Sequence, residues 1–409
     1  MTAAWFASPA RLSDVVFDLV LAEIAALRPG QQPVMSDAAM RFDGAGLALD
    51  SLEMMALSSA LSRTLHLHES QIDDNLFNLA TLADWQATAL QSLQLFSQRI
   101  SFKSSGSVGL KKYQSHDLAQ LEQEAAFLGQ LLAGRQRVLR AVPAHHIYGF
   151  MFTILLPRYL AADIAVIDIR GVSANTLQAM LQPGDLIVAY PEFWQYLASS
   201  QVHFADNVVG VNSSGPCQPE VAMHLLALDL SGFLEVYGAS ETAGIAWRAH
   251  PLNAYALMPF WQKISEHAIS RTFADGNSQT YQLPDHVQWR SNTEFLVTGR
   301  KDAIVQVGGI NVSLDAVREK LLQHAMIEDA AVRLMQPAEG GRLKAFIVLK
   351  PAYLHLLAHA QAANQDSVLA QIQHYISGHF SVAEQAKSIT LGHSIPVNHM
   401  GKRCDWPIA

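Results

Sequence analysis

The feature that most constrains the fold is a change of sequence pattern near residue 100. Before it, apolar residues such as Val16, Leu19 and Val20 recur at helical spacing, and there is no alternating strand pattern. After it, short apolar runs such as 186–189 alternate with helical patterns such as 219–228. The sequence therefore predicts a multidomain chain: an all-α helical bundle, followed by an α/β core with a mainly parallel sheet.

The expected strands of the core lie at 137–142, 164–167, 186–189, 208–211 and 234–237, and a helix is expected at 116–132. Past residue 299 the pattern becomes a smaller α+β unit, with helices expected at 314–324 and 367–379 and a strand at 343–349. At roughly 150 residues per domain, 409 residues allow two or three domains. We predict a bundle at 1–90, a linker at 91–99, a core at 100–298 and a mobile C-terminal subdomain at 299–409.

Charge changes at the same place as the pattern. Residues 1–99 hold 5 basic and 11 acidic side chains, which is −6 of the net charge of −8. The acidic balance argues against nucleic-acid binding, which needs a basic surface. Two cysteines, Cys217 and Cys404, are too few for a disulfide framework or a cysteine zinc site. The first residues lack a basic stretch followed by an apolar core, so we expect no signal peptide, and no apolar run is long enough to span a bilayer. We therefore expect a cytoplasmic protein.

The sequence Asp50-Ser51-Leu52 resembles the modification motif of an acyl carrier protein, and the loop before it and residues 76–82 after it match that family too. The resemblance implies 4′-phosphopantetheine on Ser51, attached by a phosphopantetheinyl transferase. A serine at a helix N-terminus is exposed, and the helix dipole there favours a phosphodiester. The alternative is that Asp50 and Ser51 only cap an amphipathic helix.

Five further motifs follow in the larger part of the chain. They are a Ser/Gly-rich loop at 104–112, Ala144-His145-His146-Ile147-Tyr148-Gly149-Phe150, Val236-Tyr237-Gly238-Ala239-Ser240-Glu241-Thr242, two neighbouring motifs at 299–302 and 307–312, and Pro396-Val397-Asn398-His399-Met400-Gly401-Lys402. Alone, the first would more often be a linker, and Gly308-Gly309 a simple turn. Together and in this order, they resemble the adenylate-forming acyl-CoA synthetases and the adenylation domains of peptide synthetases, over about residues 100–409.

The resemblance implies a role for each matching residue. The phosphate loop is matched by Ser104, Ser105, Gly106, Ser107, Gly109 and Lys112. Contacts to ATP or AMP are matched by Tyr237, Gly238, Ser240, Asp285 and Arg300, although Asp285 follows Leu283-Pro284 where the family usually has Thr-Gly. A single carboxylate suffices for Mg²⁺, which keeps several waters, and Glu241 matches it.

The remaining matches concern catalysis, the hinge and the acid. The residues expected to act in catalysis are Lys402, Glu241, His146 and Lys112. The hinge of the C-terminal subdomain is matched by Asp302, and the backbone of a pantetheine tunnel by Gly308 and Gly309. The wall of the acid pocket is matched by His146, Tyr148, Ser214, Gly215 and Ala239, where the alternative for His146 is a packed core imidazole.

The implied reaction has two steps. A carboxylate attacks the α-phosphorus of ATP and pyrophosphate leaves, with Mg²⁺ and the two lysines offsetting the negative charge. A thiol then attacks the acyl-adenylate and AMP leaves. The simplest acceptor is the arm on Ser51, favoured by its high local concentration. The alternatives are free CoA or a separate carrier protein, or a degenerate protein that binds acyl groups without chemistry. The degenerate protein is allowed by Val108 and Lys111, which are unusual residues for the phosphate loop. It is opposed by the presence of Glu241, Arg300 and Lys402.

The pocket motif resembles that of aryl-acid ligases and lacks an aspartate for an α-amino group, which favours an aryl or short-to-medium acyl acid. A carrier suggests secondary metabolism, with a downstream synthase or acyltransferase as partner. A homodimer is left open. The resembled ligases have a large segment before the phosphate loop that is lacking here. Either the core folds without this segment, or the helical bundle occupies part of its place. Tight packing of the bundle on the core would favour the second alternative.

Overall fold

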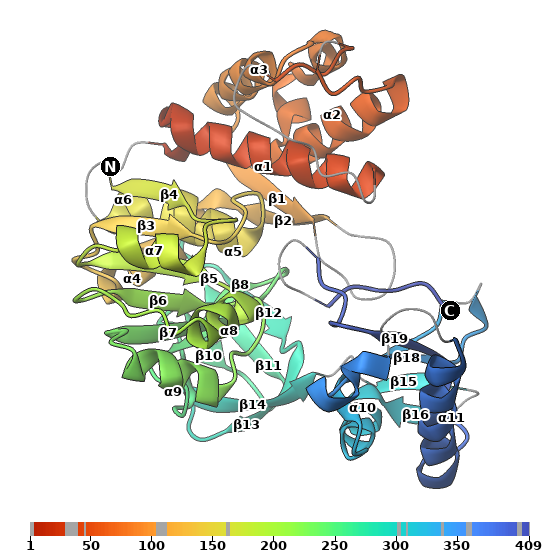
Figure 1. The fold of residues 1–409 in the computed structure, drawn as a ribbon. Coiled ribbons are helices and arrows are strands. Elements are labelled where there is room, and N and C mark those ends of the chain that lie inside the picture. The colour runs from red at the N-terminus through yellow and green to blue at the C-terminus, as the bar shows by residue number, and fades with distance from the viewer. Residues whose placement is uncertain are drawn as a thin grey trace. The chain divides into compact units, whose positions relative to one another are not determined.

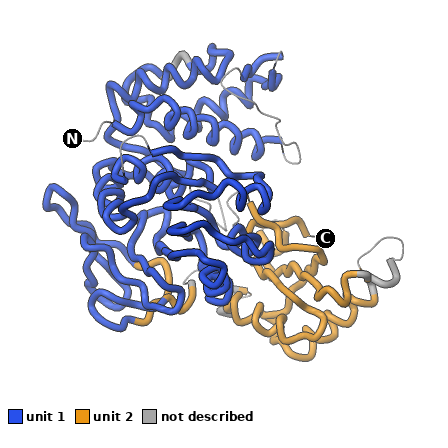
Figure 2. Tube along the Cα trace, turned by 60° about the vertical axis from the view of Figure 1, so that its left-hand side comes forward, with its two compact units in different colours: residues 1–282, 289–296, 399–401 blue, residues 283–288, 297–398, 402–409 orange. Residues whose placement is uncertain are grey.

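The computed structural model describes residues 4–28, 40–44, 46–103, 113–160, 164–300, 304–307, 310–336, 339–356, 362–398 and 403–408. Their contacts divide the chain into two compact units, shown in Figure 2. Unit 1 comprises Met1–Gln282, Trp289–Leu296 and His399–Gly401, and unit 2 comprises Leu283–Gln288, Val297–Asn398 and Lys402–Ala409. The bundle and the core that the sequence separates therefore lie in one unit, and the main division falls at 296/297 instead of 298/299.

The N-terminal part of unit 1 is helical, in agreement with the sequence pattern (Figure 1). Its helices are η1 (Trp5–Ala7), α1 (Pro9–Leu27), α2 (Ser51–Leu65), η2 (Leu67–Ser70), η3 (Asp73–Asn78) and α3 (Leu82–Leu95). The start of α2 is fixed by a capping box, in which Asp50 accepts the backbone N–H of Glu53 and the Glu53 carboxylate accepts that of Asp50. Apolar faces of the three longer helices form the interior of this bundle.

The linker predicted at 91–99 is wrong for most of its length. Helix α3 continues to Leu95, because Ser92 and Leu93 keep the buried face of the helix going. Arg99 already begins β1 (Arg99–Lys103), which pairs antiparallel with β2 (Tyr113–Asp117). Only residues 96–98 join the helix to the strand, and β1 itself packs against α2.

Unit 1 continues with a large mixed sheet. Its parallel strands are β3 (Arg137–Arg140), β4 (Ala165–Asp168), β5 (Asp185–Ala189), β6 (Val209–Asn212) and β7 (Gly232–Ala239), in the order β4-β3-β5-β6-β7. All five predicted strands are thus confirmed to within two residues. The sheet extends antiparallel through β8 (Ala243–Arg248), β9 (Tyr255–Leu257) and the start of β14 (Glu294–Arg300). A separate three-stranded sheet consists of β10 (Trp261–Lys263), β11 (Ala268–Thr272) and β12 (Ser278–Gln282).

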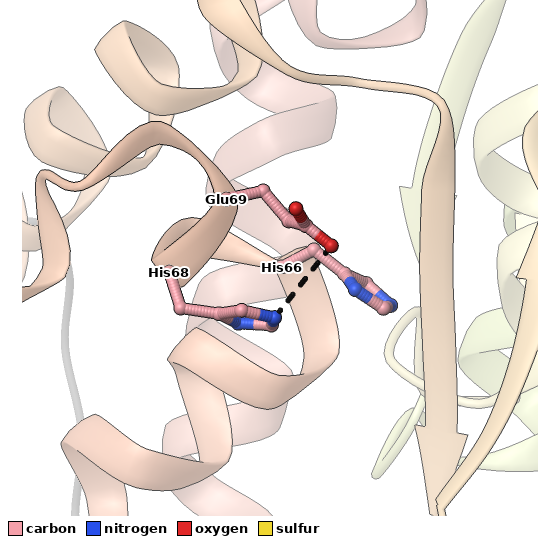
Figure 3. Close-up of side chains that lie close together, drawn as sticks. All are labelled: His66, His68 and Glu69. Atoms are coloured by element: carbon pink, nitrogen blue, oxygen red, sulfur yellow. Dashed lines mark ion pairs between the residues drawn. The ribbon is translucent and has the colours of Figure 1, made fainter.

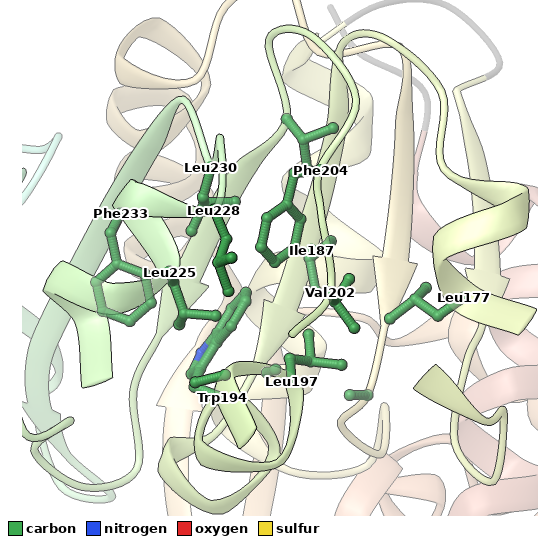
Figure 4. Close-up of a cluster of buried hydrophobic side chains, with 14 of the residues drawn as sticks. Leu177, Ile187, Trp194, Leu197, Val202, Phe204, Leu225, Leu228, Leu230 and Phe233 are labelled. Carbon is green, nitrogen blue, oxygen red and sulfur yellow. The ribbon is translucent and has the colours of Figure 1, made fainter. Parts of the chain in front are cut away.

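Helices of unit 1 lie between these strands. They are α4 (Leu118–Leu131), α5 (Ile147–Gly149), the π-helical segment η4 (Phe150–Leu155), α6 (Pro157–Leu160), α7 (Ala174–Met180), α8 (Pro191–Ser199) and α9 (Pro219–Ala227). Side chains of α7, α8 and α9 pack with alternate residues of the strands into one apolar cluster, in which Trp194 meets Phe233 at 5.2 Å between ring centroids (Figure 4). The central strand β5 is buried throughout, as expected for a parallel strand covered on both faces.

Unit 2 is a smaller α+β body, as predicted. Its elements are β13 (Asp285–Trp289), the later part of β14, β15 (Ile304–Val307), β16 (Ile310–Ser313), α10 (Leu314–Leu322), β17 (Ile327–Leu334), β18 (Leu343–Leu349), η7 (Pro351–Leu356), α11 (Ala362–His379) and β19 (Ala386–Gly392). The strand at 343–349 is where the sequence predicts it, whereas α11 begins five residues before the predicted helix. Among the described residues of either unit, no helix has the length and apolar character needed to cross a bilayer.

Candidate active site

Several predicted pocket residues lie at one edge of the large sheet, at the carboxyl ends of the parallel strands. In open α/β sheets this is the edge at which ligands bind. Tyr148 of α5 is buried at this edge of the sheet. Its hydroxyl lies 2.8 Å from the carbonyl oxygen of Ala189 and 2.9 Å from that of Val211. Burial raises the pKa of Tyr148 well above its ordinary value. The hydroxyl is thus committed to holding the ends of β5 and β6 together.

The segment after β6 carries two more predicted pocket residues, Ser214 and Gly215. Ser214 has a left-handed backbone (φ 74°), which turns the chain sharply. The turn is closed by the Asn212 amide, which donates to the carbonyl oxygen of Gly215 at 3.0 Å. Next to it, the Ser213 hydroxyl donates to the carbonyl oxygen of Val236 at 2.9 Å. These bonds hold the two pocket residues beside the end of β7.

The motif at 237–241 forms the end of β7 and the turn that follows. The half-buried ring of Tyr237 packs edge-on against Phe295, with 5.5 Å between centroids. Gly238 passes so close to β8 that a Cβ there would lie 2.1 Å from the carbonyl oxygen of Ala243, so only glycine fits. Beyond it, Glu241 is exposed, which suits a carboxylate that would meet Mg²⁺.

A buried histidine that the sequence analysis missed supports this turn. The Nε2 atom of His116, in β2, lies 2.7 Å from the carbonyl oxygen of Ser240. The residue is only 5% exposed, and burial lowers the pKa of His116 below its usual value. A neutral imidazole with a proton on Nε2 donates to this oxygen. Because Ser240 is 124 residues away, no local pattern could have revealed the contact.

Two further buried residues, Glu124 of α4 and Arg271 of β11, hold the other side of the turn. Both oxygens of Glu124 accept the backbone N–H of Gly244, at 3.0 and 3.1 Å. Arg271 donates to the carbonyl oxygen of Thr242 at 3.3 Å and lies 3.9 Å from the Glu124 carboxylate. Burial raises the pKa of Glu124 to about 7 and lowers the pKa of Arg271. The sequence analysis missed both residues.

The predicted residue His146 and its neighbour His145 lie in the loop between β3 and α5, at the same edge of the sheet. The two rings are 4.1 Å apart between centroids; His145 is buried and His146 half-buried. The loop closes tightly on itself, because a Cβ at Gly149 would lie 1.9 Å from the carbonyl oxygen of Pro143. The structure therefore brings His146 and Tyr148 to the edge that also carries Ser214, Gly215 and Ala239, all in unit 1.

Asp285 and Arg300 are the two predicted ribose contacts, and both belong to unit 2. Asp285 is the first residue of β13 and is 7% exposed. Arg300 is the last residue of the neighbouring strand β14, and its side chain lies outside the described residues. A hydrogen bond of 3.1 Å from the Thr298 hydroxyl to the carbonyl oxygen of His286 ties the two strands there. The predicted pair thus stands on adjacent strands.

Other predicted residues lie outside the described part of the chain. They are Ser104, Ser105, Gly106, Ser107, Gly109, Lys112, Asp302, Gly308, Gly309 and Lys402. The base of the segment that carries Lys402 is described: Val397 forms an antiparallel bridge with Arg403, and the N–H of Cys404 donates to the carbonyl oxygen of Pro396 at 2.9 Å.

A fully buried lysine of unit 2 anchors the chain just after Lys402. The ammonium group of Lys344, in β18, donates to the carbonyl oxygen of Trp406 at 2.7 Å and lies 3.0 Å from the carboxylates of Glu339 and Asp405. A buried charge needs such partners. The sequence analysis did not single out Lys344, which sits in an otherwise apolar strand.

Ser51 occupies the first position of α2 and is exposed, as predicted for a modified serine. Behind it, Arg28 donates to the Glu53 carboxylate, at 2.6 Å from Nε to Oε1, and to the carbonyl oxygen of Leu47 at 3.0 Å. The helix start that carries Ser51 is therefore held within the bundle. These contacts suit a modified serine and a plain capped helix equally well.

One group of side chains in the described residues has the composition of a metal site: His66, His68 and Glu69, next to the end of α2 (Figure 3). Their ligand atoms lie within 4.8 Å of one another, and His68 and Glu69 are exposed. Ligands of a tetrahedral zinc ion are about 3.3 Å apart, from Zn–N distances of about 2 Å. His66 Nε2 is also engaged by Ser101, at 2.9 Å. This hydrogen bond occupies one of the two ring nitrogens of His66 that could bind an ion.

Known proteins resemble this chain along most of its length, although no family model matches it. It is 33% identical to a 4-coumarate–CoA ligase of Halorhodospira halophila over 375 residues, which cover 91% of this chain and 92% of that protein. It is also 33% identical to a 4-coumarate–CoA ligase of Rhodobacter capsulatus over 399 residues, covering 93% and 97%. At 93% coverage the match reaches into the N-terminal bundle.

Solved structures show the same fold at lower identity. ATP-bound MatB from Rhodopseudomonas palustris superposes with a TM-score of 0.56 at 14% identity, covering 95% of this chain and 91% of that one. The O-succinylbenzoate coenzyme A synthetase MenE from Bacillus subtilis, in complex with AMP, superposes with a TM-score of 0.51 at 16% identity, covering 74% and 67%. At these identities the likeness concerns the fold alone.

Proposed function

The chain belongs to the AMP-forming acid–thiol ligases, the family of the 4-coumarate–CoA ligases, and on that premise we propose that it joins an aromatic acid of the 4-coumarate class to CoA. The observation that carries the proposal is the match to ligases of that name along almost the whole chain. The structure is consistent with it, because Tyr237, His146 and the turn with Glu241 lie at the ligand-binding edge of the sheet.

In the first step of the proposed reaction, a carboxylate oxygen of the acid attacks the α-phosphorus of ATP. The bond from that phosphorus to the bridging oxygen breaks, and pyrophosphate leaves with the electron pair. Mg²⁺ would offset the charge on the phosphates, and Glu241 is the carboxylate that would hold it. Lys112 and Lys402 would add positive charge, Tyr237 would stack on adenine, and Ser240 would meet the α-phosphate.

In the second step, the sulfur of CoA attacks the carbonyl carbon of the acyl-adenylate. The thiol loses its proton, the bond from the carbonyl carbon to the AMP oxygen breaks, and the products are AMP and an acyl thioester. We propose that Asp285 and Arg300 hold the ribose through both steps, and that Gly308 and Gly309 line the path of the pantetheine. Asp302 would be the hinge between the steps.

The structure favours CoA over the carrier arm as the acceptor. The bundle that contains Ser51 packs on the core within unit 1, and only residues 96–98 separate its last helix from β1. A carrier must swing between partners, which such a short connection opposes. The second candidate, transfer to phosphopantetheine on Ser51, is supported by the exposure of that serine at the start of α2. It would bring in a phosphopantetheinyl transferase and a downstream synthase.

An ATP–pyrophosphate exchange assay with a panel of acids tests the proposed activity. We expect exchange with 4-coumarate and cinnamate, weaker exchange with benzoate, and background with acetate and phenylalanine. Exchange with no acid, although ATP and Mg²⁺ are present, would support the degenerate binding protein instead. Exchange only with aliphatic acids would overturn the aromatic class.

The acceptor is tested by mass spectrometry of the products with wild-type protein and Ser51→Ala. If CoA is the acceptor, the acyl-CoA forms at the same rate in both proteins. If Ser51 carries the arm, the acyl group appears on the wild-type protein after treatment with a phosphopantetheinyl transferase and is absent from Ser51→Ala.

A further inference from the structure

We propose that helix α1 of the N-terminal bundle takes part in the acid-binding site, through a buried carboxylate that positions the His145-His146 loop. The positioning residue is Asp18. The inference rests on the proposed function, because it assumes that this loop faces the acid. It gives the N-terminal bundle a task in ligation that needs no modification of Ser51.

Asp18 lies on α1, but its carboxylate accepts hydrogen bonds from the α/β core. Its Oδ2 accepts two hydrogen bonds, one from the backbone N–H of Ala144 and one from Nη1 of Arg140, each with 2.6 Å between nitrogen and oxygen. Its Oδ1 accepts the Nη2 of Arg170 at 2.7 Å. The residue is 1% exposed, so this carboxylate is buried at a junction of segments more than 120 residues apart in the chain.

The positions of these partners in the chain explain how Asp18 can fix the conformation of the loop that carries His145 and His146. Arg140 is the last residue of β3, and Ala144 directly precedes the histidine pair. One carboxylate oxygen therefore ties the end of the strand to the first residue before His145. Ala144 is fully buried, so its N–H could not be satisfied by bulk water if the carboxylate were removed. We expect the loop to move in that case.

Two other contacts between the bundle and the core lie away from this loop. Glu23 of α1 pairs with Lys103 of β1 at 2.7 Å, and the ring of Trp5 packs on Phe150 at 5.1 Å between centroids. These contacts help to hold the bundle and the core together. The bond to the N–H of Ala144 is different, because it acts on the backbone that carries His145 and His146.

Asp14 provides a matched control on the same helix, one turn before Asp18. Its Oδ1 accepts the Nη2 of the same Arg140 at 3.0 Å, and its side chain is 31% exposed. Asp14 thus shares the helix, the charge and one arginine partner with Asp18. Within the described part of the chain its hydrogen bond goes to Arg140 and not to the loop.

The test compares Asp18→Ala, Asp18→Asn, Asp14→Ala and wild type as full-length proteins in ATP–pyrophosphate exchange. We expect Asp18→Ala to raise KM for the acid about tenfold, the effect of one charge-assisted hydrogen bond, with KM for ATP unchanged. Asp18→Asn, which keeps one acceptor for the N–H of Ala144, should show a smaller rise. Asp14→Ala should leave both constants unchanged.

Hydrogen exchange of the backbone amides at 141–146 provides a readout that does not depend on activity. We expect faster exchange there in Asp18→Ala and Asp18→Asn, with β5 and β6 unaffected. Unchanged exchange in folded Asp18 variants would overturn the inference, as would an equal rise of both KM values or the same effects in Asp14→Ala. If Asp18→Ala does not fold, amide exchange and the KM values of Asp18→Asn test the inference in its place. If wild type activates no acid but the loop loosens as expected, the proposed function fails and the positioning by Asp18 stands.

Discussion

At the residue scale, the candidate site depends on a few positions where the backbone leaves no freedom. Gly238 is one, since its Cβ would overlap the carbonyl oxygen of Ala243. We predict that Gly238→Ala displaces the turn with Glu241 and lowers acid activation about a hundredfold, as misplacement by about 1 Å does. Gly378 in α11 has open space around its Cβ position and serves as the control. Gly378→Ala should keep full activity; equal losses in both variants would contradict the prediction.

Glu124 gives a second prediction at this scale, on pH. Its pKa is about 7 in the folded protein against an ordinary 4.5, because it is buried. The folded state thus binds this proton more tightly than the unfolded chain, so stability is lost as pH rises from about 4.5 to about 7. In Glu124→Gln we expect this loss to be absent. Relative to wild type, the variant should gain about 2 kcal/mol between pH 5 and pH 8 in urea unfolding.

Glu122 of the same helix is the control for that measurement, since its carboxylate pairs with Arg158 outside the network around Gly244. A difference between wild type and Glu124→Gln that does not change with pH would show that burial does not govern this carboxyl. The same pH-dependent gain in Glu122→Gln would point to a general effect of removing charge from α4.

At the scale of elements, the strand ends are held by side chains from outside the strands. The Tyr148 hydroxyl bonds to carbonyl oxygens at the ends of β5 and β6. We predict that Tyr148→Phe costs about 1–3 kcal/mol of unfolding free energy, because two buried carbonyls lose the one hydroxyl proton that they share. Urea unfolding measures this cost. Tyr281→Phe is the control, because among the described residues the Tyr281 hydroxyl donates to the exposed Gln279, and this variant should change stability by less than about 0.5 kcal/mol. A similar cost in both variants would contradict the assignment.

At the scale of the whole molecule, the N-terminal bundle behaves as part of the core. Its contacts with the core include the hydrogen bond between Asp18 and Arg140 and the packing of Trp5 on Phe150. We predict that deletion of residues 1–98 abolishes acid activation and yields aggregated protein, because it exposes Phe102 and Phe150 and leaves Arg140 without two carboxylates. Gel filtration and pyrophosphate exchange measure the outcome. A soluble, active truncation would show that the core folds and works without the bundle.

The sequence alone predicted the fold class and the strands of the core, since buried parallel strands are continuous apolar runs between turn residues. The pocket residues were expected only from the family resemblance, and the structure places several of them where parallel strands end at one edge of the sheet. The linker predicted from residue 91 onward was wrong at 91–95. There α3 continues, and its residues Ser92 and Leu93 are buried. In a short helix, tertiary packing outweighs such local composition.

What the sequence by itself determined is therefore local: the periodicity of helices and strands, the capping box at Asp50, and the glycines that tight turns require. Only the tertiary structure decided which buried polar groups meet. Asp18 and Arg140 are 122 residues apart, Glu124 and Gly244 120, and His116 and Ser240 124. Each of these groups is buried and needs a partner, but its own surroundings in the sequence do not specify which one. That choice is made when the chain folds and brings distant segments together, and it joins α1 to the loop of the histidine pair.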